Sequence, residues 1–191
     1  MATQDELRES MKKAAAALRD ADVPFILAGS MACWARGGPV SQHDVDFMVK
    51  PEDADRAVKA LEEAGLRIER PPEGWLFKAW DGDVLVDLIW SPSGMEITDE
   101  VFARADALNV HAVTMRVMRL EDVIVTKLAA LREHELDYER ILEISRSLRE
   151  LIVWDEVRRE APDNPYVRAF FTMIEGLGIA PPSEAHTAAT P

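Results

Sequence analysis

The chain has 191 residues, of which 48% are hydrophobic and 30% are charged, and its 35 acidic and 22 basic residues give a net charge of −13. This composition excludes a disordered or fibrous protein. The surplus of acidic residues argues weakly against a protein that binds the phosphates of long nucleic acids. The single cysteine, Cys33, excludes an internal disulfide and a cysteine-rich zinc site and favours the cytoplasm. No apolar run approaches the roughly 18–20 residues of a membrane helix, so we expect no membrane association.

The first 118 residues alternate between the helical and the strand periodicity of apolar side chains. The expected helices cover residues 3–20, 31–36 and 51–64, and the expected strands cover residues 25–28, 43–49, 66–69, 75–80, 84–90 and 110–113. Thr3 and Glu6 have the spacing of a capping box at the start of the first helix. Asp81 and Gly82 form a hairpin signal between two strands, whereas residues 91–107 fit neither periodicity.

From residue 120 onwards the pattern is that of amphipathic helices alone, expected at residues 120–133, 137–150, 151–160 and 165–177. We therefore expect an α/β core over residues 1–118, a helical region over 119–178, and a small, Pro/Ala-rich tail without regular structure over 179–191. The predicted fold class is α/β (α+β), with a small mixed β-sheet flanked by helices and followed by a C-terminal helical bundle.

The dipeptide Gly29-Ser30 ends a predicted strand just before a predicted helix. Glycine lets the backbone approach a ligand closely, and the start of the helix offers free N–H groups and a positive dipole. A phosphate group fits this position, with the Ser30 hydroxyl as an additional donor. An ordinary turn between a strand and a helix has the same pattern, so the dipeptide alone is not specific.

Asp44 and Asp46 lie two residues apart within an apolar strand. Residues i and i+2 of a strand point to the same face, so the two carboxylates project side by side. Their repulsion is costly unless a cation lies between them. Oxygen ligands suit Mg²⁺, which takes one or two carboxylates together with substrate phosphates. The alternative interpretation is a strand with one solvated face.

Asp87 lies in the apolar strand at residues 84–90, and by parity Leu85 and Ile89 share its face. A charge in an apolar row requires a partner. A third metal-binding carboxylate on a neighbouring strand would explain this aspartate. The alternative is an aspartate that is paired or partly exposed.

Together these motifs resemble the DNA polymerase β-like nucleotidyltransferase superfamily, which combines a Gly-Ser turn, an Asp-x-Asp pair and a further Asp on a later strand. Here they are L-A-G-S at 27–30, D-V-D at 44–46 and V-D-L at 86–88. More narrowly, the chain looks like the minimal, AbiEii/MNT-type bacterial nucleotidyltransferases, some of which are toxins. These often carry E-D-x-x-x-x-K at the start of a helix after the catalytic sheet, and residues 121–127 match that motif. The resemblance covers roughly residues 22–145.

The resemblance implies Mg²⁺-dependent transfer of a nucleoside monophosphate from an NTP to an acceptor hydroxyl, with Mn²⁺ as an alternative cation. Two metal ions about 3.5–4 Å apart can hold the attacking and leaving oxygens in line. Asp44 and Asp46 would bind the metals. Asp87 would complete the metal site on the acceptor side and help to deprotonate the attacking hydroxyl.

The resemblance also implies how the nucleotide is held. Gly29 and Ser30 would bind the β and γ phosphates, and Lys127 would add a phosphate contact from its helix. Glu121 and Asp122 are expected to cap that helix rather than to catalyse, because carboxylates favour a first turn. A basic residue that precedes this helix in some toxins is matched either by Lys78 or by Arg116.

The acceptor is left open among tRNA, a protein side chain and a small molecule. A toxin-like role with an antitoxin partner follows from the resemblance alone. A modifier of small molecules, of the aminoglycoside nucleotidyltransferase kind, would share the site and would have an enclosed acidic acceptor pocket. The alternative from another class is a catalytically silent nucleotide-binding or interaction protein of the same fold. Convergence of the three aspartates on one point would favour the enzyme.

Overall fold

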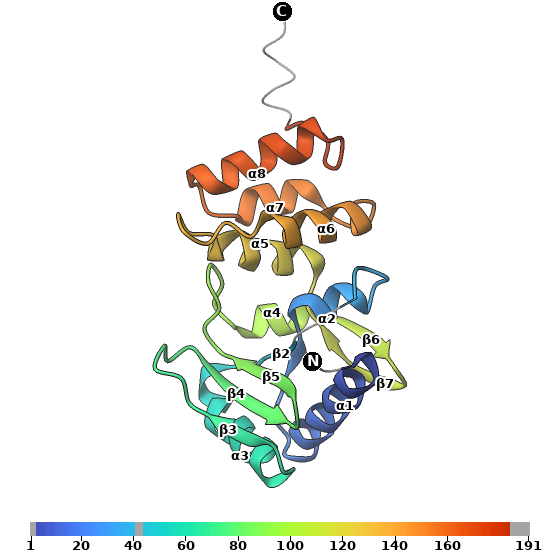
Figure 1. Ribbon diagram of the computed structural model, residues 1–191, viewed down its shortest axis with the longest axis vertical. Coiled ribbons are helices and arrows are strands. Elements are labelled where there is room, and N and C mark those ends of the chain that lie inside the picture. Colours follow the sequence, from blue (N-terminus) through green and yellow to red (C-terminus); the bar gives the residue numbers. More distant parts are fainter. Residues whose placement is uncertain (1–2, 41–43, 184–191) are drawn as a thin grey trace, which may run out of the picture.

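The computed structural model describes residues 3–40 and 44–183 of the chain. The strands of this part form one mixed sheet of seven, in the order β3-β4-β5-β2-β1-β7-β6. They are β1 Ile26–Leu27, β2 Asp44–Met48, β3 Arg67–Glu69, β4 Leu76–Asp81, β5 Val84–Ile89, β6 Asp106–Val110 and β7 Val113–Val117. Neighbouring strands are antiparallel except for the pairs β1–β7 and β2–β5, which are parallel. Figure 1 shows the sheet in one half of the molecule and a stack of helices in the other.

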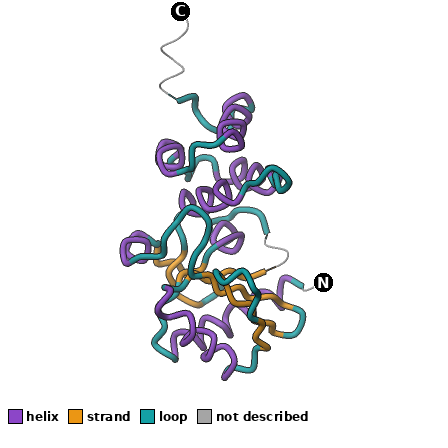
Figure 2. The backbone as a smooth tube through the Cα atoms, turned by 90° about the vertical axis from the view of Figure 1, so that its left-hand side faces the viewer, coloured by secondary structure: helices purple, strands orange, loops and turns teal. Residues whose placement is uncertain are grey.

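In the described part of the chain, some helices contact the sheet and others form a stack beyond it. They are α1 Gln4–Asp20, α2 Gly29–Trp34, α3 Ala54–Glu63, α4 Asp99–Arg104, α5 Leu120–Ala130, α6 Tyr138–Leu148, α7 Trp154–Glu160 and α8 Pro165–Gly176. α1 and α3 contact the central strands β2 and β5 or their neighbours and cover one face of the sheet. α5 contacts α2 as well as α6, α7 and α8, so it lies between the sheet and the helical stack (Figure 2).

Burial alternates along the central strands and separates the core from a polar face. Val45 and Phe47 of β2 and Val86 and Leu88 of β5 are fully buried. The intervening residues of both strands are only half-buried. Because successive strand side chains point to opposite faces, the core side chains face α1 and α3, and the intervening residues face α2 and α5.

Most of the predicted elements are present with shifted ends. The capping box of Thr3 and Glu6 is formed, and Gly82 has the positive φ of +62° that the hairpin turn requires. Asp81 is a strand residue rather than a turn residue, and its carboxylate accepts hydrogen bonds from Ser10 and Lys13 of α1. The helix expected at 151–160 begins only at Trp154. Residue 43 and the predicted tail beyond residue 183 lie outside the described residues.

The strand expected at residues 110–113 is wrong. β6 and β7 form a hairpin over residues 106–117, and His111 and Ala112 are its turn, with φ of 48° and 67°. The side chain of Asn109 accepts a hydrogen bond of 3.0 Å from the backbone N–H of Ala112 and supports the turn. α4 lies within the segment 91–107 that fitted neither periodicity.

Within residues 3–40 and 44–183, none of the helices combines the length and the hydrophobicity that spanning a membrane requires.

Candidate functional site

Asp44, Asp46 and Asp87 meet at one point of the sheet. β2 and β5 are parallel neighbours whose register pairs Asp46 with Asp87, so both side chains leave the same face of the sheet. Asp44 precedes Asp46 by two residues and shares that face. One carboxylate oxygen from each aspartate lies within 4.8 Å of the other two. The parity of the two strands therefore brings together three carboxylates that are 43 positions or fewer apart in the chain.

The environment of this cluster disfavours negative charge. Burial, together with the neighbouring charges of Asp44 and Asp87, raises the pKa of Asp46 to about 7 against the opposing effects of Lys127 and Lys78. Burial likewise raises the pKa of Asp87 to about 6, with Lys78 acting in the opposite direction. The nearby positive charge is thus too small to hold the pKa of Asp46 and of Asp87 at the usual value of about 3.9.

Asp87 has an unsatisfied buried oxygen that fits a metal ligand. Its Oδ1 is buried and accepts no hydrogen bond from any described residue. Lys78 Nζ, on the neighbouring strand β4, lies 3.7 Å from it, beyond hydrogen-bond range. Buried polar atoms are normally hydrogen-bonded, so a carboxylate oxygen held among the described residues by a long ion pair alone has the capacity to bind a further ligand. A donor set made only of carboxylate oxygens suits a hard divalent cation such as Mg²⁺.

Gly29 and Ser30 lie beside this cluster at the start of α2. Gly29 has φ of +56°, and a Cβ at this position would lie 1.7 Å from Oδ2 of Asp46. The backbone N–H of Ala28 donates a 2.8 Å hydrogen bond to the carbonyl of Asp46, which fixes the turn against β2. The first turn of α2 contains no acidic side chain. The turn therefore presents backbone and a half-buried serine next to the carboxylates.

The charge of Lys127 lowers the pKa of Asp46 and of Cys33 in α2, and its helix α5 packs against α2. Lys127 also lines a cavity of about 330 Å³ between α5 and α6. The charged residues around this cavity are Lys127, Glu135, Asp137 and Arg140. Lys127 therefore both acts on Asp46 through its charge and lines this cavity.

Of the two basic residues that matched the resemblance, Lys78 lies at the cluster. It is paired in register with Asp87 across β4 and β5. Arg116 is on β7 and donates a 2.6 Å hydrogen bond to the carbonyl of Phe102.

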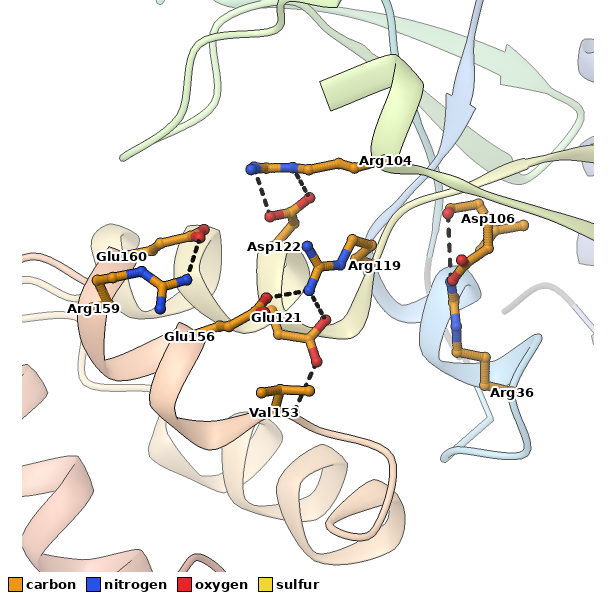
Figure 3. A network of polar contacts seen from close by, with 11 residues as sticks. Arg36, Arg104, Asp106, Arg119, Glu121, Asp122, Val153, Glu156, Arg159 and Glu160 are labelled. Carbon is orange, nitrogen blue, oxygen red and sulfur yellow. Dashed lines mark hydrogen bonds and ion pairs between the residues drawn. The ribbon is translucent and has the colours of Figure 1, made fainter. Parts of the chain in front are cut away.

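Glu121 and Asp122 lie in the first turn of α5, as their sequence position predicts, but they do not cap it. The residue that precedes α5 is Arg119, and its side chain makes no capping hydrogen bond. Both carboxylates are almost fully buried. They bind residues of other elements instead, as Figure 3 shows.

Solved structures of nucleotidyltransferases share this fold. The crystal structure of ANT(2″)-Ia in complex with adenylyl-2″-tobramycin aligns with a TM-score of 0.61 and 20% identity, over 87% of this chain and 97% of that one. The solution structure of the antibiotic-resistance factor ANT(2″)-Ia aligns with a TM-score of 0.63 and 19% identity, over 92% and 97%. TM1012 from Thermotoga maritima, described as a nucleotidyltransferase, aligns with a TM-score of 0.52 and 18% identity, over 67% and 86%.

No curated protein matches the chain. A family model described as "Nucleotidyl transferase of unknown function (DUF2204)" matches residues 7–161, which is most of the sequence. The chain therefore belongs to this family of nucleotidyltransferase enzymes.

Proposed function

We propose that this enzyme transfers a nucleoside monophosphate from an NTP to a hydroxyl group of a small molecule, with a divalent cation held by Asp44, Asp46 and Asp87. The observation that carries the proposal is the cluster of these carboxylates, with ligand atoms within 4.8 Å of one another. The unsatisfied Oδ1 of Asp87 supports a cation at this point. Bound there, Mg²⁺ would neutralise the charge that develops on the phosphates during transfer.

The chain's own residues would orient the nucleotide. The backbone at Gly29 lies so close to Asp46 that it leaves no space for a Cβ. Together with Ser30, this backbone would bind the β and γ phosphates. Lys127 would bind the triphosphate from the opposite, helical side. Positioning and charge neutralisation account for most of the catalysis in phosphoryl-type transfer, so few other groups are needed.

The transfer itself forms one bond and breaks another. The acceptor oxygen bonds to the α phosphorus, the bond from that phosphorus to the β-phosphate oxygen breaks, and pyrophosphate leaves. The hydroxyl proton passes to a base, and Asp87 is the carboxylate that we assign to this role. It lies on β5, which neighbours β2 on the side away from β1 and the Gly29 turn.

The small-molecule acceptor is supported by the cavity that Lys127 lines. Its volume of about 330 Å³ is within the range of sites for small ligands. Glu135 and Asp137 in its wall favour an acceptor that carries an amino group as well as a hydroxyl. The structural neighbour ANT(2″)-Ia was solved with adenylyl-2″-tobramycin, an adenylylated compound. The net charge of −13 makes a long RNA acceptor unfavourable.

A transfer assay tests this function. The enzyme is incubated with Mg²⁺, a cell extract and ATP, GTP, CTP or UTP labelled at the α phosphate, beside Asp46→Asn and the control Asp83→Asn. Asp83 is an exposed carboxylate in the hairpin next to β5. We expect label on a small molecule with the wild type and with Asp83→Asn, and none with Asp46→Asn.

Other outcomes of the same assay separate the alternatives. Label on RNA or on protein would leave the reaction intact and overturn the small-molecule acceptor, and it would favour a cytoplasmic toxin with an antitoxin partner. No transfer from any NTP, with Mg²⁺ or Mn²⁺, would favour a catalytically silent nucleotide-binding protein.

A further inference from the structure

The first turn of α5 carries two adjacent carboxylates that the proposed reaction does not use. Glu121 is 5% exposed and Asp122 is 1% exposed. Carboxylates are rarely buried to this extent unless they are paired. The partners of Glu121 and Asp122 come from elements on opposite sides of the helix (Figure 3).

Asp122 binds the α/β part of the molecule. Arg104 Nε donates a 3.0 Å hydrogen bond to its Oδ2, and Arg104 Nη2 forms an ion pair with its Oδ1 at 2.8 Å without hydrogen-bond geometry, so two prongs of the guanidinium face the carboxylate. Arg104 is the last residue of α4, the helix that follows the strand of Asp87. The first residue of α4, Asp99, pairs with Lys50, which lies just after the strand of Asp44 and Asp46. α4 is thus bound to the cluster's strands at its start and to α5 at its end.

Glu121 binds the helical stack. Its Oε1 accepts a 2.8 Å hydrogen bond from the backbone N–H of Val153, the residue before α7. Its Oε2 lies 3.3 Å from Nη2 of Arg119, which also pairs with Glu156 of α7. Neighbouring residues on one helical turn therefore bind the α/β part and the helical stack.

α5 is also held at its other end, close to Lys127. Gly94, in the loop between β5 and α4, approaches α5 so closely that a Cβ on it would lie 2.4 Å from the Cβ of Ala129. Lys127 lies between this contact and Asp122, about 7.5 Å along the helix axis from Asp122. The distance between its ammonium group and Asp46 therefore depends on the position of α5 relative to the sheet.

We infer that Asp122, together with Arg104, is a positioning residue that sets Lys127 over the carboxylate cluster, while Glu121 binds the same turn to α7. The inference rests on the proposed function, because it requires Lys127 to bind the triphosphate. Asp122 touches no reacting group and acts through the orientation of α5. Asp122→Asn would remove the ion pair that joins α4 to the first turn of α5, so this turn would move and would take Lys127 with it.

A double-mutant cycle on nucleotide affinity tests this inference. Calorimetry gives the Kd of the Mg²⁺ complexes of ATP, GTP, CTP and UTP, and the tightest is then used with Asp122→Asn, Lys127→Met and the double variant. Loss of one charge-assisted phosphate contact is expected to weaken binding by about tenfold. Asp122→Asn should lose most of that factor, and the double variant should bind no more weakly than Lys127→Met alone. Multiplied losses in the double variant would overturn the inference, because independent sites are additive.

Two further variants separate positioning from general loosening of the helices. Glu175→Gln breaks the 2.8 Å pair with Arg158 between α7 and α8, which is also largely buried, and should leave Kd within about twofold. Arg104→Lys keeps the charge but loses the two-pronged geometry, so its Kd should lie between those of the wild type and Asp122→Asn. Equal losses in Glu175→Gln and Asp122→Asn would contradict a specific role.

The single variant Lys127→Met distinguishes the two possible failures. Unchanged affinity in this variant would show that the phosphate role of Lys127, part of the proposed function, is wrong. A loss in Lys127→Met with no loss in a folded Asp122→Asn protein would refute the positioning role alone. Thermal unfolding monitored by circular dichroism establishes that each variant is folded.

Discussion

Gly29 and Asp46 are in such close contact that a methyl group on the glycine would lie 1.7 Å from Oδ2 of the aspartate. The backbone of the turn between β1 and α2 therefore packs directly against the carboxylate of Asp46 on β2. Two independent features require a glycine at position 29. Its φ is +56°, and there is no space for a Cβ beside Asp46.

Gly29→Ala is expected to abolish most of the transfer activity and to destabilise the fold. Gly82→Ala is a matched control, since Gly82 has a similar φ of +62° and nothing within 4 Å of an added Cβ. The control should lose only the cost of a left-handed alanine, about 1 kcal/mol, and should remain active. Urea unfolding and the transfer assay compare the two. Equal effects would mean that the contact with Asp46 contributes nothing beyond backbone strain.

The stability of the metal-free protein should fall as the pH rises through the window between the unfolded and folded pKa values of Asp46. The folded value is about 7, whereas the unfolded value is about 3.9. Between them the folded state keeps a proton that the unfolded state has lost, so the free energy of unfolding decreases with pH until about pH 7.

Asp46→Asn removes this titration and should unfold at a higher temperature than the wild type at pH 8 in EDTA. The gain is expected to be on the order of 2 kcal/mol, and it should shrink towards pH 4. Thermal unfolding of both proteins across that range measures it. A wild type and variant with parallel pH profiles would contradict a raised pKa at this position.

Mg²⁺ should restore the stability that the metal-free protein loses when Asp46 ionises, because the cation binds the folded protein and not the unfolded chain. At pH 8 the midpoint temperature of the wild type should rise with Mg²⁺ concentration, and that of Asp46→Asn should rise much less. Asp83→Asn, which alters a carboxylate outside the cluster, should respond like the wild type. An equal response of all three proteins would place the binding of Mg²⁺ elsewhere.

Lys78→Met should shift the acid limb of the pH–rate profile towards higher pH. Lys78 lowers the pKa of Asp87 and of Asp46 by its charge, so its removal makes both carboxylates harder to ionise. Lys59→Met is the control, because Lys59 is an exposed residue of α3 that pairs with Glu63. An unchanged acid limb in Lys78→Met, with the rate at the optimum preserved, would mean that Lys78 does not influence the reacting carboxylates.

The carboxylate cluster was accessible from the sequence because strand parity is a local rule. Asp44 and Asp46 had to share a face, and Asp87 stood out in an apolar row. The position of Lys78 could have been derived as well. The hairpin pairs Asp81 with Val84, and counting outwards along an antiparallel register places Lys78 opposite Asp87.

Other features depend on partners that are distant in the chain. The turn at His111 and Ala112 contains neither the Gly nor the Asn that usually marks a positive φ, so the sequence does not reveal the β6–β7 hairpin. The partners of Asp122 and Glu121 are 18 and 32 residues away. A first-turn carboxylate has the same sequence pattern whether it caps a helix in solvent or pairs in the interior, so capping was the natural expectation and the burial could not be foreseen.

The most direct test of the metal-dependent site is a crystal structure with Mn²⁺ and a non-hydrolysable NTP analogue, in which anomalous scattering locates the metal. We expect Mn²⁺ to be bound by Asp44, Asp46 and Asp87, with the triphosphate contacting Gly29, Ser30 and Lys127. A nucleotide bound elsewhere, or an anomalous peak away from these three aspartates, would contradict it.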